Sequence, residues 1–198
     1  MKQVVLATGN TGKVKEIMGM LQPLGWQVTP QTELFQTEAV EDGLSFIENA
    51  LIKARYACAQ TGLPAMADDS GIEVAALQGQ PGIYSSRFAG EAASDQENIA
   101  KMLREMQEVA DGQRQASFYC AMAFCRHEHD PTPMIALGQW HGEVLREPVG
   151  GGGFGYDPIF YVPDLGISSA ELTKARKSQI SHRALALKSL VEQIKQLG

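Results

Sequence analysis

Residues 4–13 read Val4-Val5-Leu6-Ala7-Thr8-Gly9-Asn10-Thr11-Gly12-Lys13, and this order indicates a strand, a glycine-containing loop and the start of a helix. The helix is indicated because the apolar residues after the loop recur at helical spacing: Val14, Ile17, Met18 and Leu21. Gly9 and Gly12 carry no Cβ, so an anion can approach the backbone closely there. A helix N-terminus attracts anions, and Lys13 adds a positive charge at the same place. The segment therefore indicates a cradle for a phosphate chain, or else an ordinary strand-to-helix turn with a solvated lysine.

The loop differs from a Walker A motif at two positions. That motif requires glycine where this chain has Ala7, and a serine or threonine to hold magnesium where it has Val14. Any metal ligands must therefore come from elsewhere in the sequence.

The composition indicates an ordinary globular protein. A chain of 198 residues without repeats or linkers is most simply one domain spanning residues 1–198, and 44% hydrophobic with 20% charged residues is typical of soluble proteins. The net charge of −6 argues against binding to nucleic acid or to anionic membranes. There is no targeting signal after Met1, no run of membrane-spanning length and no CxxC spacing among the three cysteines. We therefore expect a cytoplasmic protein with reduced cysteines.

The remaining sequence alternates between helical and strand patterns. Ser45 and Glu48 form a capping box that begins a helix over residues 46–59, on which Asn49 and Lys53 share one face. We expect its apolar face to consist of Leu44, Ile47, Leu51 and Ala54. Further patterns predict a helix after the Ser94–Glu97 capping box and strands at 65–67, 115–126 and 134–137, with an extension of the last strand to 144 left open. They also predict a last helix after Ser181 with the stripe Leu187, Leu190, Val191, Ile194 and Leu197. The mixture predicts an α/β fold with a mixed central sheet and flanking helices.

Two acidic segments are candidate metal or catalytic sites. Asp68-Asp69-Ser70-Gly71 follows a buried strand, and adjacent carboxylates in one turn can hold a hard cation, activate water, or divide these tasks. The alternative is an Asp-rich turn that caps its own backbone. Glu41-Asp42-Gly43 precedes the first predicted helix and has the corresponding alternative of a solvated loop.

Two later segments suit recognition of a nucleobase. Four glycines precede Phe154, Gly155, Tyr156 and Asp157; the aromatic rings could stack on a base, and the carboxylate could accept from a ring N–H. The alternative is a flexible connector anchored by its aromatic residues. Cationic donors then follow at Lys177, His182 and Arg183, and such donors can bind a carbonyl on a base edge. The stretch 127–130 (His-Glu-His-Asp) is read as an exposed turn and not as a metal site.

Taken in order, these segments resemble the inosine triphosphate pyrophosphatase family, and within it the bacterial members that act on dITP, ITP and XTP. The matching segments run from one end of the chain to the other: Thr8–Lys13, Glu41–Gly43 with Phe46 and Glu48–Ala50, Ala67–Gly71, Pro81–Arg87, Gly153–Pro158 and Ser181–Arg183. The resemblance implies two lobes around a substrate cleft, a homodimer, a requirement for Mg²⁺, and cleavage of a purine nucleoside triphosphate into the monophosphate and pyrophosphate.

The resemblance also implies a role for individual residues. Thr8, Gly9, Asn10, Thr11, Gly12 and Lys13 would hold the phosphates, with Lys53 nearby. Glu41 and Asp69 would bind magnesium with Asp68 in support, and Asp69 would accept the proton of the attacking water. Phe154 would stack on the purine, Asp157, His182 and Arg183 would read its edge, and Ser70, Gly155, Tyr156 and Lys177 would complete the contacts.

Three other functions remain open from the sequence. They are a Maf-like pyrophosphatase for other modified nucleotides, a nucleotide sensor without turnover, and a nucleic-acid-binding module, which the acidic net charge disfavours. The sequence also leaves open the ranking among ITP, dITP and XTP, and the division of work between Asp68 and Asp69.

Overall fold

A mixed sheet is the centre of the fold. The computed structural model describes residues 3–21 and 25–196. Within them, seven strands are hydrogen-bonded in the order β2-β1-β3-β4-β5-β6-β7. The strands are β1 (Gln3–Leu6), β2 (Gln27–Pro30), β3 (Ala65–Val74), β4 (Gln115–Cys125), β5 (Met134–Val144), β6 (Phe160–Val162) and β7 (Ile167–Ser168). β1 runs parallel to β2 and β3, whereas β5, β6 and β7 pair in antiparallel fashion. The predicted α/β fold with a mixed sheet is therefore confirmed.

The chain divides into two compact units, each assembled from separate segments. Unit 1 comprises residues 1–69, 120–138 and 182–198, and unit 2 comprises residues 70–119 and 139–181. Strands β3, β4 and β5 contribute residues to both units. The expectation of a single domain over residues 1–198 stays a prediction.

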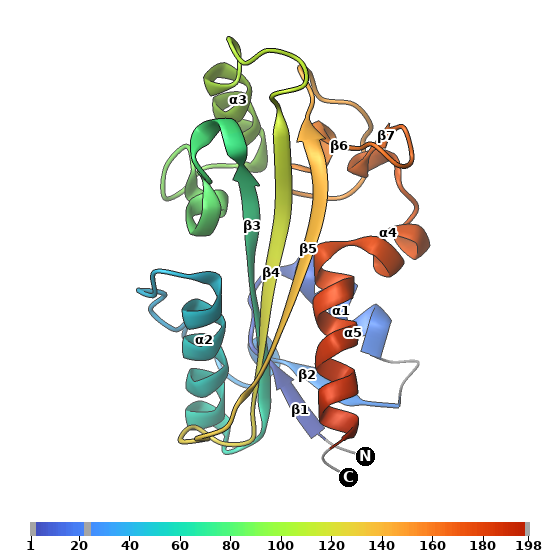
Figure 1. Cartoon of the computed structure of the whole chain (residues 1–198). Coiled ribbons are helices and arrows are strands. Elements are labelled where there is room, and N and C mark those ends of the chain that lie inside the picture. The colour runs from blue at the N-terminus through green and yellow to red at the C-terminus, as the bar shows by residue number, and fades with distance from the viewer. Residues whose placement is uncertain (1–2, 22–24, 197–198) are drawn as a thin grey trace. The chain divides into compact units, whose positions relative to one another are not determined.

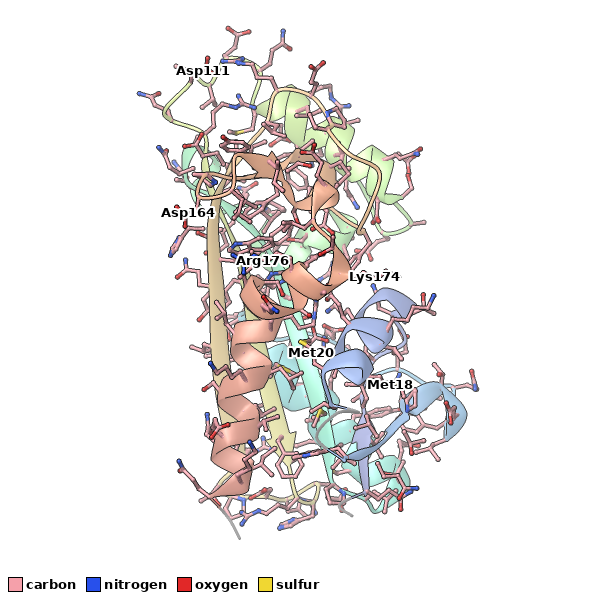
Figure 2. The ribbon with its side chains drawn as sticks, turned by 90° about the vertical axis from the view of Figure 1, so that its right-hand side faces the viewer. Met18, Met20, Asp111, Asp164, Lys174 and Arg176 are labelled. Atoms are coloured by element: carbon pink, nitrogen blue, oxygen red, sulfur yellow. The ribbon has the colours of Figure 1, made fainter. Side chains whose placement is uncertain are left out.

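Unit 1 places helices on both faces of its strands. Helix α2 (Phe46–Thr61) covers one face, and α1 (Thr11–Leu21) with α5 (His182–Lys195) covers the other (Figure 1). Apolar side chains of α1 and α5 form a core with the strand residues beneath them, including Met66, Cys120 and Met122. Met18 and Met20 pack at the border of this core, on the side of the molecule seen in Figure 2. Because both faces are covered, β4 is buried continuously from Cys120 to Cys125.

Unit 2 has its own core. It contains helix α3 (Asp95–Glu105) and the short α4 (Lys174–Ile180), and the rings of Phe118, Trp140 and Phe160 pack together with centroids 4.5–6.3 Å apart. The capping box of α3 is formed as predicted, because Ser94 and Glu97 each accept from the other's backbone N–H.

Three details of the sequence prediction are corrected. Leu44 lies outside α2 and is 86% exposed, because the helix begins at Phe46. Of the expected stripe, Ala54 is buried and Ile47 and Leu51 are half-buried, while Phe46, Ala50 and Ala57 complete the buried face. The predicted turn at residues 68–71 is part of β3, a strand of ten residues. Asp130, at the end of the turn after β4, is buried, because its carboxylate accepts from the Arg126 side chain and from the backbone of Arg126 and Thr132.

The other predicted elements agree with the structure. The stripe of the last helix is buried at Leu187, Leu190, Val191 and Ile194, and its last member, Leu197, lies outside the described residues. The three cysteines, Cys58, Cys120 and Cys125, are free and buried. Over residues 3–21 and 25–196, the structure contains no helix of the length and apolarity needed to cross a membrane.

Candidate functional site

The loop after β1 is held by its own side chains. Oδ1 of Asn10 accepts from the backbone N–H groups of Gly12 and Lys13, at 2.9 and 3.1 Å, and thereby caps α1. Oγ1 of Thr8 accepts from the N–H of Asn10. A Cβ on Gly9 would lie 2.7 Å from Oε1 of Glu38, so this flexible carboxylate lies against the loop. The backbone N–H groups of Gly12 and Lys13, which the sequence suggested for binding phosphate, therefore already donate to the Asn10 side chain. The positive charge that this segment offers to an anion is the ammonium of Lys13.

The two adjacent aspartates of β3 have different surroundings. Successive residues of a strand point to opposite faces of the sheet. Asp68 and Asp69 therefore point to opposite faces of the sheet, and in unit 1 one face is covered by α1 and α5 and the other by α2 (Figure 1). Their partners follow this division, since Asp68 contacts side chains from α1 and α5 and Asp69 contacts side chains from α2.

Asp68 is part of a buried ionic network. It is completely buried, and its Oδ2 lies 3.0 Å from Nζ of Lys13 and 3.2 Å from Nε of Arg183. Nη1 of Arg183 also donates to Glu16 on α1. Burial by itself raises the pKa of Asp68, but Lys13 and Arg183 outweigh it and hold this pKa well below its usual range. Asp68 is therefore a permanent anion that positions two cations.

Asp69 belongs to a second group of charges, which includes Glu41. Nζ of Lys53 lies 2.8 Å from Oδ1 of Asp69 and 2.9 Å from Oε2 of Glu41. The side chain of Asn49, one turn earlier on α2, donates from Nδ2 to Oδ2 of Asp69 at 3.3 Å and accepts the N–H of Gly43 at Oδ1. Asn49 and Lys53 therefore reach one site together, as their spacing predicted.

Burial sets the acidity of this second group. It raises the pKa of Asp69 above the ordinary value, although Lys53 and Lys13 act in the opposite direction. For Lys53, burial lowers the pKa, but Asp69, Glu41 and Asp68 outweigh it, so the net shift is upward. Asp69 is thus the more basic of the two adjacent aspartates, and Lys53 is a firmly protonated ammonium.

The donor set around Lys53 suits a hard cation. The carboxylates of Glu41 and Asp69 converge on one positive charge, and carboxylate oxygens are the protein ligands that Mg²⁺ prefers. Among the described residues, no group of three or more His, Cys, Asp or Glu side chains is arranged to hold a metal. Magnesium usually binds through one or two carboxylates plus water and substrate phosphate, so two converging carboxylates meet its requirement. The contacts of Asp68 in the structure are to cations, and its supporting role at the metal stays a prediction.

In unit 2, Asp157 organises the loop that follows the glycine run. Its Oδ2 accepts from the N–H of Phe154 at 2.9 Å and from Nζ of Lys177 at 2.6 Å, and its Oδ1 accepts from Oγ of Ser169. Nζ of Lys177 lies 4.9 Å from the centroid of the Phe154 ring. Lys177 is buried, whereas Lys174 and Arg176 on the same helix are exposed (Figure 2). Asp157 and Lys177 therefore fix the position of the Phe154 ring.

Two further contacts hold this loop. Asp95, the first residue of α3, accepts the N–H of Gly155 at 2.7 Å, and the hydroxyl of Tyr156 donates to the carbonyl of Ser85. The ring of Tyr156 is buried in the core of unit 2, so Phe154 is the aromatic residue of this loop suited to stacking on a base.

The predicted residues fall into two groups. Unit 1 brings Lys13, Asp68 and Arg183 together, and likewise Glu41, Lys53 and Asp69, and it contains His182, a buried residue at the start of α5. Unit 2 brings Phe154, Asp157 and Lys177 together and contains Ser70, which is half-buried in β3. The sequence analysis missed Glu16, Asp95 and Ser169 as partners of these residues. Glu16 lies three residues after Lys13 on α1, but its partner is Arg183 on α5, and spacing along α1 gives no signal for that pair.

Known proteins are similar to this chain in sequence and in fold. The sequence pattern of the Ham1 family matches residues 4–193. The chain belongs to the Ham1 family. The protein of Vibrio parahaemolyticus named dITP/XTP pyrophosphatase is 55% identical over 194 residues, which cover 98% of this chain and 97% of the relative. The protein of the same name from Escherichia coli K12 is 53% identical over 195 residues, covering 98% and 99%. The solved structure of a HAM1 protein from Coxiella burnetii superposes with a TM-score of 0.91 at 47% identity, covering 99% of this chain and 100% of that one. These Ham1 relatives confirm the resemblance found in the sequence.

Replacing Arg183 by alanine is expected to lower the free energy of unfolding by about 3–5 kcal/mol, because it leaves Asp68 and Glu16 with less compensating charge in a buried site. Arg146→Ala is the matched control, since Arg146 is exposed and pairs with the exposed Asp111, which is labelled in Figure 2. This exposed pair should contribute little or nothing to the free energy of unfolding. Urea denaturation measures both, and equal losses in the two variants would contradict a stabilising network around Asp68.

Two glycines of the same run provide a test of the Phe154 loop. A Cβ on Gly153 would lie 2.0 Å from Oδ2 of Asp157, and its φ of +75° is one that residues with a side chain rarely adopt. Gly153→Ala should therefore displace Asp157 and raise KM for a purine triphosphate by about tenfold or more. A Cβ on Gly151 meets nothing within 4 Å, so Gly151→Ala should leave KM unchanged. Similar KM values for the two variants would show that the contact of Gly153 with Asp157 is unimportant for binding.

Proposed function

We propose that this protein hydrolyses the non-standard purine nucleotides dITP, ITP and XTP to the monophosphate and pyrophosphate, with Mg²⁺ as cofactor. The observation that carries the proposal is the geometry around the adjacent aspartates: Asp68 lies between Lys13 and Arg183, whereas Asp69 converges with Glu41 on Lys53. This asymmetry is what a metal-assisted hydrolase needs. The names of the relatives, dITP/XTP pyrophosphatase, support the same reaction.

The charges of unit 1 suit the triphosphate. Cleavage between the α- and β-phosphates depends mainly on position and on neutralising the charge that develops on the leaving pyrophosphate. Lys13, held by Asp68 next to the loop Thr8–Gly12, and Lys53 would supply positive charge from the protein. A magnesium ion held by Glu41 and Asp69 would add electrostatic stabilisation of the phosphate oxygens.

Asp69 is the residue best suited to accept the proton of the attacking water. A general base works best when its pKa is raised toward the working pH, and burial raises that of Asp69. Asp68 is poorly suited, because Lys13 and Arg183 hold its pKa well below the usual range. We therefore assign the base to Asp69 and the positioning of cations to Asp68.

Selectivity among nucleoside triphosphates would come from recognition of the nucleobase. Phe154 would stack on the purine from a position fixed by Asp157 and Lys177. Hypoxanthine and xanthine carry an oxygen at position 6, where adenine carries an amino group, so donors from His182 and Arg183 would favour the 6-oxo bases. The homodimer and the cytoplasmic location implied by the resemblance belong to this proposal as well.

Asp69→Asn should reduce kcat by on the order of a thousandfold, because it removes the base and the charge of a metal ligand while retaining the shape. Asp164→Asn makes the same change at an exposed position (Figure 2) and should leave kcat unchanged. Pyrophosphate release measures the rate, and circular dichroism checks folding. Activity of Asp69→Asn within a few-fold of the unmodified protein would exclude Asp69 as the base.

A panel of triphosphates tests the substrate class. With Mg²⁺, we expect kcat/KM for ITP, dITP and XTP to exceed that for ATP and CTP by at least about a hundredfold, because a donor pair facing an amino group is left unmatched. Ribose and deoxyribose forms should differ little, and GTP should be hydrolysed slowly. Equal hydrolysis of ATP and ITP would exclude the proposed selectivity. Absence of turnover with any triphosphate, including other modified nucleotides, would favour a sensor.

A further inference from the structure

The ammonium of Lys53 lies where two proposed metal ligands meet. Its Nζ is 2.9 Å from Glu41 Oε2 and 2.8 Å from Asp69 Oδ1, and the Lys53 side chain is only 14% exposed. A magnesium ion bound by the same two carboxylates would need those oxygens at about 2.0–2.1 Å. One place between two carboxylates cannot hold both an ammonium and a divalent ion, because the two cations repel each other at short range.

The two carboxylates have a second connection that does not involve Lys53. Asn49 donates to Asp69 and accepts the N–H of Gly43, two residues after Glu41. The Gly43 backbone lies so close to α2 that a Cβ there would be 2.6 Å from Cβ of Glu48. The segment that carries Glu41 is thus tied to α2 and to Asp69, and it can keep its position when the lysine moves away.

The side chain of lysine suits such a movement. Its ammonium is a compact charge on a flexible four-carbon stem, so it can change partners while its backbone stays in the helix. Once moved, the ammonium would require another anion nearby, and a triphosphate supplies several negative oxygens. A free metal ion brings no such anion.

We propose that Lys53 is an internal counter-ion that excludes free divalent metal from Glu41 and Asp69 and moves to the triphosphate when metal and nucleotide bind together. This inference rests on the proposed function, because it assumes that these two carboxylates hold the metal. Metal and nucleotide then bind cooperatively: the metal displaces Lys53 from the two carboxylates, and the triphosphate supplies the anion that the displaced ammonium needs. Lys53 is accordingly a positioning residue for the metal as well as a phosphate contact.

Titration with Mn²⁺ in the absence of nucleotide tests the exclusion. By calorimetry, Lys53→Gln should bind Mn²⁺ at least about tenfold more tightly than the unmodified protein, because the competing cation is gone. Lys53→Arg retains the charge and should bind Mn²⁺ as weakly as the unmodified protein. Arg55→Gln removes one positive charge from an exposed position on the same helix and is the matched control, with Mn²⁺ affinity unchanged. No gain in affinity for a folded Lys53→Gln would overturn the inference.

The unmodified protein provides a second test, which holds even if Lys53→Gln does not fold. The side-chain ¹⁵N resonance of Lys53 should be unaffected by millimolar Mg²⁺ alone. It should shift when Mg²⁺ is added together with a non-hydrolysable ITP analogue. A shift with Mg²⁺ alone would show that free metal displaces the lysine and would overturn the inference. Both measurements are independent of the triphosphate panel, so a protein that hydrolyses ITP and fails these tests refutes the counter-ion role alone.

Discussion

Charge compensation inside a strand is the constraint on which the rest of unit 1 depends. Asp68 and Asp69 follow each other in β3 and are both buried, and helices cover both faces of the strands of unit 1 (Figure 1). An uncompensated buried carboxylate is too costly for a folded protein, so each of the two needs cations on its own side of the sheet. Lys13 and Arg183 meet this need for Asp68, and Lys53 meets it for Asp69. The helices that cover each face thus determine which cations surround each aspartate, and these cations shift its pKa.

The same principle explains the loop of unit 2. Asp157 is 2% exposed and receives a lysine, a hydroxyl and a backbone N–H, so its charge holds the loop together. The close approach of Gly153 to this carboxylate shows why a residue without a side chain is needed there. In both units a buried aspartate is held by charged and polar partners, Asp68 in unit 1 and Asp157 in unit 2.

Prediction from the sequence succeeded where the signal was local. Helical spacing identified α1 and correctly placed Asn49 and Lys53 on one face of α2, and the Ser94–Glu97 capping box identified the start of α3. It failed at residues 68–71, which local statistics assign to a turn. A buried strand is possible there only because cations from distant segments compensate the two carboxylates, and no local pattern contains that information. Likewise Glu16 and Asp95 were missed, because their partners are 167 and 60 residues away.

The sequence by itself determined the fold class, the family and the residue types available for binding phosphate, metal and purine, because these depend on local periodicity and on motifs in a fixed order. Only the tertiary structure decided which cations each of the two aspartates faces, and that Lys53 lies between Glu41 and Asp69. The physical reason is that a strand alternates its side chains between two faces, and the residues covering each face come from elements far apart in the chain.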